Sequence, residues 1–279
     1  MWAEEAENSW ILANYWQYPG CGMNRVLIVK WDCLYARFLA EAVLEFYPQA
    51  RIDSVFTSES ARVRLLQHSY DLVIAGLSFD DGDGLPLIFA MAQSAEVQAL
   101  LLVTLRKDAQ TLGLLRQFRR ISVFDPARDA PERFALAIAH VSQSRRYLSP
   151  TFHELLMSSD SGHHTLYAQL TETERMVLSV IGDGSDDKSA GERLGLEPAS
   201  VHAHRKRLMR KLGVQTREML FRRALELGVV RILPDGRTAR PSFDVMKSQI
   251  ESRKRLLATR RLREPALRKR MPVLLNETG

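Results

Sequence analysis

The chain has 279 residues, enough for about two domains, with 46% hydrophobic and 26% charged residues, as in ordinary globular proteins. It has no apolar run of about 18 residues, so we expect no membrane span. Its two cysteines, Cys21 and Cys33, form no metal-binding or disulfide pattern. We therefore expect no metal, no cofactor and a reducing, cytoplasmic location.

The net charge of +6 is spread unevenly along the chain. Residues 1–170 hold 15 Lys+Arg and 19 Asp+Glu, which gives −4. Residues 171–232 hold 12 and 9, which gives +3, and residues 233–279 hold 12 and 5, which gives +7. Either the basic back half meets a polyanion or the C-terminus is simply a solvated basic segment.

The first segment, residues 1–22, is aromatic-rich and acidic. It lacks the basic start and apolar centre of a signal peptide. Either it packs on the next domain or on a partner, or translation starts at Met23. We treat it as an N-terminal extension without an assigned function.

Strand and helix patterns alternate through residues 23–148. Largely apolar runs predict strands at 25–29, 71–77, 98–104 and 121–124, and the run ARIDSVF at 50–56 also predicts a strand. Helical spacing predicts helices at 35–46, 58–68, 85–92, 109–117 and 131–145. Five β–α units indicate an α/β domain with a five-stranded, doubly wound parallel sheet. In such a sheet, ligands bind at the carboxyl ends of the strands.

Three runs in this domain carry a resemblance to a known family: RVLIVKWD, DLVIAGLSFDDGDGLPLI and LLLVT. They resemble the CheY-like receiver domain of two-component response regulators, and AIAHVSQSRRYLSP is similar to the last helix of the NarL/FixJ subfamily. The resemblance implies a pocket for an aspartyl phosphate and Mg²⁺. That chemistry needs a carboxylate nucleophile and acidic metal ligands.

The residues of this pocket depart from the family. Lys30 and Trp31 stand where the family has an acidic pair, and Gly76 stands where it has the phosphorylated aspartate. Gly76 has no side chain to phosphorylate, and Lys30 brings a cation to the Mg²⁺ position. We interpret the domain as a degenerate pseudo-receiver that neither accepts phosphate nor binds Mg²⁺ in the usual way.

Three other pocket positions complete this interpretation. Thr104 matches the family's switch hydroxyl, Asp125 matches its lysine, and Asp32 lies one position late but near the mouth of the pocket. Either Lys30 pairs with Asp32 or Asp125 and holds one fixed conformation, or it extends to solvent.

The DDGDG run invites a metal interpretation through Asp80, Asp81 and Asp83. We favour a polar turn, because the spaced ligands and the distal glutamate of a calcium loop are missing.

Residues 149–169 are predicted to form a linker with a short helix near Phe152.

Residues 170–232 predict four short helices, at 173–181, 188–194, 198–212 and 217–227. Thr171 and Glu174 form a capping box before the first helix. Gly195 suits a left-handed turn, and Pro198 suits the first turn of the third helix. From Pro198 to Thr216 there is no acidic residue, and this third helix carries a run of cations suited to a phosphate backbone.

The pieces LTETE, ERLGLEPASVHAH and RKLGV hold their order across about sixty residues. This stretch resembles the LuxR/FixJ-type (GerE) helix-turn-helix, which implies an all-α four-helix domain with its third helix in the major groove of DNA. Gly191 and His202 depart from the family. Gly191 weakens its helix by about 1 kcal/mol. His202 stands where the family often has lysine, which would make the contact with DNA weaker or pH-sensitive.

Carried over position by position, the resemblance implies two sets of contacts. The residues expected to face bases are His202, Ala203 and Lys206. The residues expected to hold phosphates are Lys188, Ser200, Arg207, Arg210 and Lys211. His204 takes a semi-buried position, where we expect a structural role.

The C-terminal extension, residues 233–279, is basic and goes beyond the resemblance. Three alternatives stay open: it adds non-specific contacts to the DNA backbone, it is a solvated tail, or it docks on the acidic first domain. We interpret the protein as a transcription regulator and not an enzyme. We expect it to bind double-stranded DNA as a homodimer or as a heterodimer with another regulator, away from membranes, without control by aspartyl phosphate. The alternative is an interaction protein that titrates a kinase or a partner regulator and barely binds DNA alone.

Overall fold

The computed structural model describes residues 23–158, 166–233 and 236–240. Five parallel strands form the central sheet in the order β2-β1-β3-β6-β7. Their bounds are β1 Arg25–Val29, β2 Arg51–Val55, β3 Tyr70–Ala75, β6 Val97–Val103 and β7 Ile121–Phe124. The inner strands β1, β3 and β6 are apolar on both faces, as expected when helices cover both sides, whereas the edge strand β2 is more polar and more exposed.

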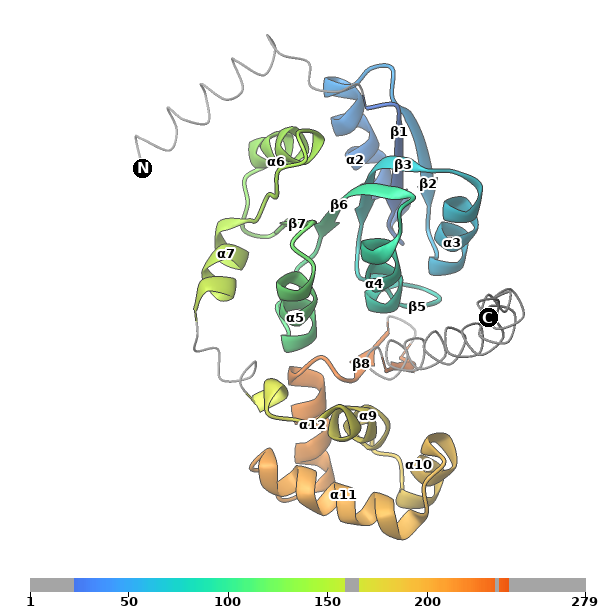
Figure 1. Ribbon diagram of the computed structural model, residues 1–279, viewed down its shortest axis with the longest axis vertical. Coiled ribbons are helices and arrows are strands. Elements are labelled where there is room, and N and C mark those ends of the chain that lie inside the picture. Colours follow the sequence, from blue (N-terminus) through green and yellow to red (C-terminus); the bar gives the residue numbers. More distant parts are fainter. Residues whose placement is uncertain (1–22, 159–165, 234–235, 241–279) are drawn as a thin grey trace, which may run out of the picture.

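Helices lie on both faces of this sheet (Figure 1). Their bounds are α2 Cys33–Phe46, α3 Ser58–Gln67, α4 Leu85–Gln93, α5 Ala109–Gln117, α6 Glu132–Ser142 and α7 Pro150–Met157. Helices α2 and α6 pack with one face of the sheet in one buried cluster. Helices α3, α4, α5 and α7 contribute to a second cluster on the opposite face. The predicted doubly wound fold is therefore confirmed.

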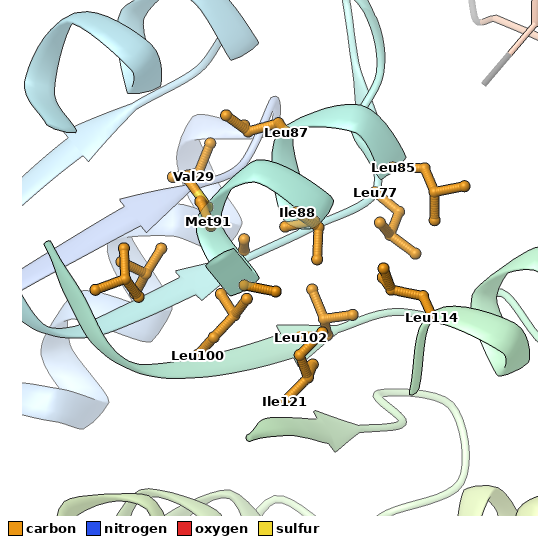
Figure 2. Packing of buried hydrophobic residues seen from close by; sticks show 14 of the residues in the cluster. Val29, Leu77, Leu85, Leu87, Ile88, Met91, Leu100, Leu102, Leu114 and Ile121 are labelled. Atoms are coloured by element: carbon orange, nitrogen blue, oxygen red, sulfur yellow. The ribbon is translucent and has the colours of Figure 1, made fainter. Parts of the chain in front are cut away.

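The second cluster is the larger part of the core. Figure 2 shows Ile88 and Met91 of α4 facing Leu100 and Leu102 of β6, with Ile121 of β7 next to them. All five side chains are buried. Burying a side chain of this size contributes about 1.5–3 kcal/mol, so the packing fixes α4 on β6 and with it the loops at the carboxyl edge.

The C-terminal helical domain has four main helices around a third cluster. They are α9 Glu172–Ile181, α10 Asp187–Leu194, α11 Pro198–Lys211 and α12 Arg217–Glu226. The expected capping box between Thr171 and Glu174 is present. Gly195 ends α10 with φ 65°, and Pro198 starts α11. These local signals place the turn between α10 and α11.

Two short hairpins are absent from the sequence prediction. Strands β4 Ser78–Phe79 and β5 Gly82–Asp83 pair after β3, and β8 Arg231–Ile232 pairs with β9 Thr238–Ala239 after α12. Each strand has two residues, too few for a period-2 pattern to be visible. The other predicted ends differ by no more than a few residues, as is usual at element boundaries.

Parts of three predicted segments lie outside the described residues: the N-terminal extension, residues 159–165 of the linker, and the C-terminal extension beyond 240. Within the ranges that are described, no helix is both long and apolar enough to cross a bilayer. The same ranges contain no group of three or more His, Cys, Asp or Glu side chains that could hold a metal ion.

Gly191 has a packing role that its helix propensity does not show. A Cβ at Gly191 would lie 2.5 Å from the carbonyl oxygen of Leu196, in the turn that joins α10 to α11. The carbonyl is backbone and cannot rotate away. The glycine therefore allows α10 to approach this turn closely, which offsets its cost to the helix.

We expect Gly191→Ala to lower the free energy of unfolding by about 1–3 kcal/mol, as in other overpacked sites. The matched control is Gly113→Ala in α5, where the added Cβ meets nothing within 4 Å. That control should raise stability by about 1 kcal/mol. Urea unfolding of both variants checks the pair, and stabilisation by both would contradict the close approach.

Candidate nucleic-acid interface

Helix α11 runs along the outer side of the helical domain, away from the five-stranded sheet (Figure 1). Val201 and Leu208 bury its inner side in the helical core. The three side chains predicted to face bases are all exposed: His202, Ala203 and Lys206. His202 and Lys206 are four residues apart and share one face of the helix.

The predicted phosphate contacts are also exposed: Lys188, Ser200, Arg207, Arg210 and Lys211. Lys188 lies on α10, and the other four lie on α11. Arg207 and Arg210 follow Ala203 at helical spacing, so two cations continue the row that begins at this base-facing position. The structure thus brings both predicted sets to α11 and the helix beside it.

Lys211 differs from the other cations because a carboxylate already holds it. Its Nζ donates to Glu174 Oε2 at 2.8 Å. Burial alone would raise the pKa of Glu174, but the hydrogen bonds from Lys211 and from the Thr171 backbone keep that pKa below its usual value. This ion pair ties the end of α11 to the start of α9, so Lys211 reaches a phosphate only by sharing or leaving Glu174.

Arg205 is the one cation of α11 that points inward. Its side chain is 4% exposed, Nε donates to Asp187 Oδ1 at 2.7 Å, and Nη2 donates to the carbonyl of Ser185. The sequence shows only its charge, since Asp187 lies 18 positions earlier. Arg205 therefore fixes α11 to the first turn of α10.

Asp187 also orients the predicted base reader. Nδ1 of His202 lies 3.1 Å from Asp187 Oδ2, which leaves the other ring nitrogen of this half-exposed side chain for an outside partner. Burial alone would raise the pKa of Asp187, but hydrogen bonds from Arg205 and His202 outweigh it and lower that pKa. The carboxylate stays ionised and holds the imidazole in one orientation.

His204 is half-buried, as expected for a structural position. Its Nδ1 is buried and has no hydrogen-bond partner among the described atoms. It lies on the part of α11 that turns from the exposed face toward the core.

At the strand ends that resemble the receiver pocket, the side chain of Lys30 lies beside Gly76. A Cβ placed on Gly76 would lie 3.1 Å from Cδ and 3.3 Å from Nζ of Lys30. The ammonium lies over the ring of Tyr35, 4.6 Å from its centre, and the residue is half-buried. Burial lowers the pKa of Lys30 to about 8, against a smaller opposing attraction from Asp32.

The acidic residues near this pocket are engaged elsewhere. Asp32 caps α2, where Oδ1 accepts from the backbone of Leu34 at 2.9 Å. Asp125 is fully buried, and its Oδ2 lies 2.6 Å from Nζ of Lys107. The expected ion pair between Lys30 and Asp125 is therefore wrong. The pairing with Asp32 is limited to attraction at longer range.

The two remaining pocket positions are Thr104 and Trp31. The hydroxyl of Thr104 is buried and accepts from the backbone N–H of Arg106 at 3.1 Å. Trp31 is 48% exposed. The pocket thus holds built-in cations and hydrogen-bonded loops at the places where the resemblance implies a metal and a phosphate.

The DDGDG run forms a turn with structural contacts. The carboxylate of Asp81 accepts from the backbone N–H of Ser58 and Glu59 at 3.0 Å each, and so caps α3. Asp83 accepts from the backbone of Leu85 at 2.8 Å. These contacts agree with the predicted polar turn, and their carboxylates cap helices.

Comparison with known proteins supports the helical domain most directly. Residues 168–224 match the GerE model, described as bacterial regulatory proteins of the luxR family. The transcriptional regulatory protein MctR of Rhizobium johnstonii is 43% identical over 61 residues, which are 22% of this chain and 28% of that protein. The transcriptional regulatory protein UhpA of Escherichia coli is 33% identical over 99 residues, 36% of this chain and 47% of that protein. The chain thus spans less than half the length of these two relatives.

Longer matches are weaker in identity. The oxygen regulatory protein NreC of Staphylococcus carnosus is 24% identical over 72% of this chain and 96% of its own length. A structure of RcsB from Salmonella enterica serovar Typhimurium bound to a promoter aligns with 75% of this chain and all of that chain, at 18% identity and a TM-score of 0.49. The sequence match and the four-helix packing agree for the C-terminal part, where residues 168–224 match the GerE model.

Proposed function

We propose that the protein is a sequence-specific, DNA-binding transcription regulator. The observation that carries this proposal is α11, an acid-free helix on which Lys206, Arg207 and Arg210 are all exposed. In a helix-turn-helix, such a helix enters the major groove. The relatives named as transcriptional regulatory proteins support the same reading.

Each contact class follows from the geometry of α11. His202, held by Asp187, offers one ring nitrogen to a base edge, and Lys206 reaches guanine O6 or N7. Arg207, Arg210 and the more distant Lys188 hold phosphates, which fix the register of the helix on the duplex. Two copies on paired half-sites are the usual way for one such helix to gain specificity, as a homodimer or as a heterodimer with another regulator.

We further propose that this regulator works without aspartyl phosphate and acts in the cytoplasm. Gly76 offers no carboxylate, and the side chain of Lys30 fills the space above it. The buried carboxylate of Asp125 is paired with Lys107. The input is then the amount of protein, a partner regulator, or a small ligand in the pocket.

The second candidate is an interaction protein that titrates a kinase or partner regulator. The lack of a carboxylate at position 76 favours this candidate. So does the ion pair between Lys211 and Glu174, which engages one of the cations predicted to hold phosphate. A salt series of gel shifts on random duplex separates the two candidates. Tight binding that weakens steeply with salt supports the regulator, and no binding without a partner supports the interaction protein.

Lys206→Ala tests the recognition helix. We expect specific affinity to fall by about 1–3 kcal/mol and the preference at one base pair to relax, because an exposed cation at a base edge is lost. Fluorescence anisotropy on the selected site and on single-base variants measures both effects. The control is Arg62→Ala, an equal charge change at an exposed position of α3. If Lys206→Ala binds as the wild type does, our placement of α11 in the groove is wrong.

Treatment with acetyl phosphate and Mg²⁺ tests the pocket. We expect no mass increase in the intact protein and no change in DNA affinity, because position 76 has no nucleophile. Intact mass spectrometry and a binding curve before and after treatment are sufficient. Stoichiometric addition of a phosphoryl group would overturn the proposal.

Lys30→Met tests the buried ammonium. The folded pKa of Lys30, about 8, lies below its ordinary value of 10.5. Below pH 8 both states are protonated and the full desolvation cost opposes folding; the cost falls between pH 8 and 10.5 and is gone above that range. The variant should therefore gain about 1–3 kcal/mol at pH 7 and nothing near pH 10.5.

Urea unfolding at both pH values measures this difference. The matched control is Lys206→Met, which replaces an exposed lysine and should change stability little at either pH. A gain for Lys30→Met that is equal at both pH values would show that burial of the charge is not its cause.

A further inference from the structure

Four charged side chains from both domains meet at the carboxyl edge of the sheet. Nη1 of Arg106 donates to Asp83 Oδ2 at 2.6 Å, and its Nε donates to Asp108 Oδ2 at 3.1 Å. Arg231, from the helical domain, places Nη1 3.4 Å from the same atom of Asp108 and Nε 3.9 Å from Asp83 Oδ2. We call these four residues the junction cluster.

The side chains of the junction cluster are mostly buried. The side chains of Asp83, Arg106 and Asp108 are 4% to 7% exposed, and that of Arg231 is 28% exposed. Two cations face two carboxylates, so the cluster is neutral only when Arg231 is in place. Removing one partner of such a buried set leaves an uncompensated charge, which is far more costly than losing a surface ion pair.

Neighbouring contacts hold Arg231 against this site. Gly228, with φ 73°, lies so close to Asp108 that a Cβ there would approach its Cγ to 2.5 Å. Ala109, the first residue of α5, packs into the core of the helical domain. Arg237, beyond β8, donates to the carbonyl of Asp80 at 2.8 Å. Apolar, steric and ionic contacts therefore converge on one face of the sheet edge.

The backbone of Arg231 is itself fixed to the helical domain. It follows directly after Val229 and Val230, which are fully buried in the core of α9 to α12. Figure 1 shows β8 between the sheet and the helices, with α11 on the opposite side. A domain held at β8 therefore presents α11 outward.

We propose that Arg231 is a latch that docks the helical domain on the carboxyl edge of the sheet with the recognition helix facing away. In the full chain, α11 is then accessible to DNA without a prior change in the arrangement of the two domains. This inference goes beyond the proposed function; only its DNA readout rests on that function, and its structural readout does not.

Arg231→Met tests the latch in the full chain, because it removes the charge and keeps much of the apolar volume. We expect amide hydrogen exchange in residues 106–111 and 228–233 to become about tenfold faster or more. We also expect the radius of gyration from X-ray scattering to increase. Arg62→Met, at an exposed site on α3, is the control and should change neither. Unchanged exchange and scattering for Arg231→Met would overturn the latch.

The double variant Arg231→Met/Asp108→Asn separates loss of the contact between the domains from a simple folding defect. It leaves Arg106 opposite Asp83 alone, which restores charge balance, and asparagine still caps α5 where Asp108 accepts from the backbone of Thr111. This variant should fold well and still show fast exchange in residues 228–233. Exchange as slow as in the wild type would mean that Arg231 does not hold the domains together.

A DNA-binding measurement shows whether the Arg231 contact leaves α11 free to bind or inhibits it. If α11 already faces away, the affinity of Arg231→Met for a single half-site stays within about twofold of the wild type. An increase of tenfold or more would show that the contact restrains α11, and would overturn the proposal. If no form binds DNA, the proposed function fails, while the exchange and scattering results still decide the latch.

Discussion

The guanidinium of Arg106 is the constraint on which both halves of the structure depend. It is 7% exposed, and it is held by two carboxylates and by the backbone carbonyl of Leu77 at 3.2 Å. It thus joins the loop after β3 to the loop after β6, where Thr104 accepts from its backbone N–H. An ion this deeply buried persists only when its partners stay in place. The loops of the sheet edge and the docking of Arg231 are therefore parts of one arrangement.

The exposed helix α11 and the strand-end residues around Gly76 arrange their charged side chains in opposite ways. On α11, Arg205 turns inward to Asp187 so that the neighbouring His202 and Lys206 remain exposed. In the pocket, the charges are turned toward the protein: Lys30 lies over Gly76, and Lys107 pairs with Asp125. The first surface keeps its chemistry available to a ligand, whereas the second satisfies much of it internally.

Much of this fold could be predicted because its signals are local. The bounds of β1 and α5, the Thr171 capping box and the left-handed Gly195 depend on residues a few positions apart. The exposed sets on α11 followed from the resemblance. The inward turn of Arg205 and the Lys107–Asp125 pair could not be predicted, because their partners are 18 positions apart in sequence. The packing role of Gly191 could not be predicted either, since its close approach to Leu196 exists only in the folded turn.

The lysine over Gly76 also changes how the pocket is linked to its surroundings. A ligand that binds only the folded state adds stability that rises with its free concentration. An ammonium attached to the chain has no free concentration, and at pH values below its pKa of about 8 it is mostly present as the cation. In the proposed regulator, the positive charge beside Gly76 is therefore supplied by the chain itself and not by a dissolved ion.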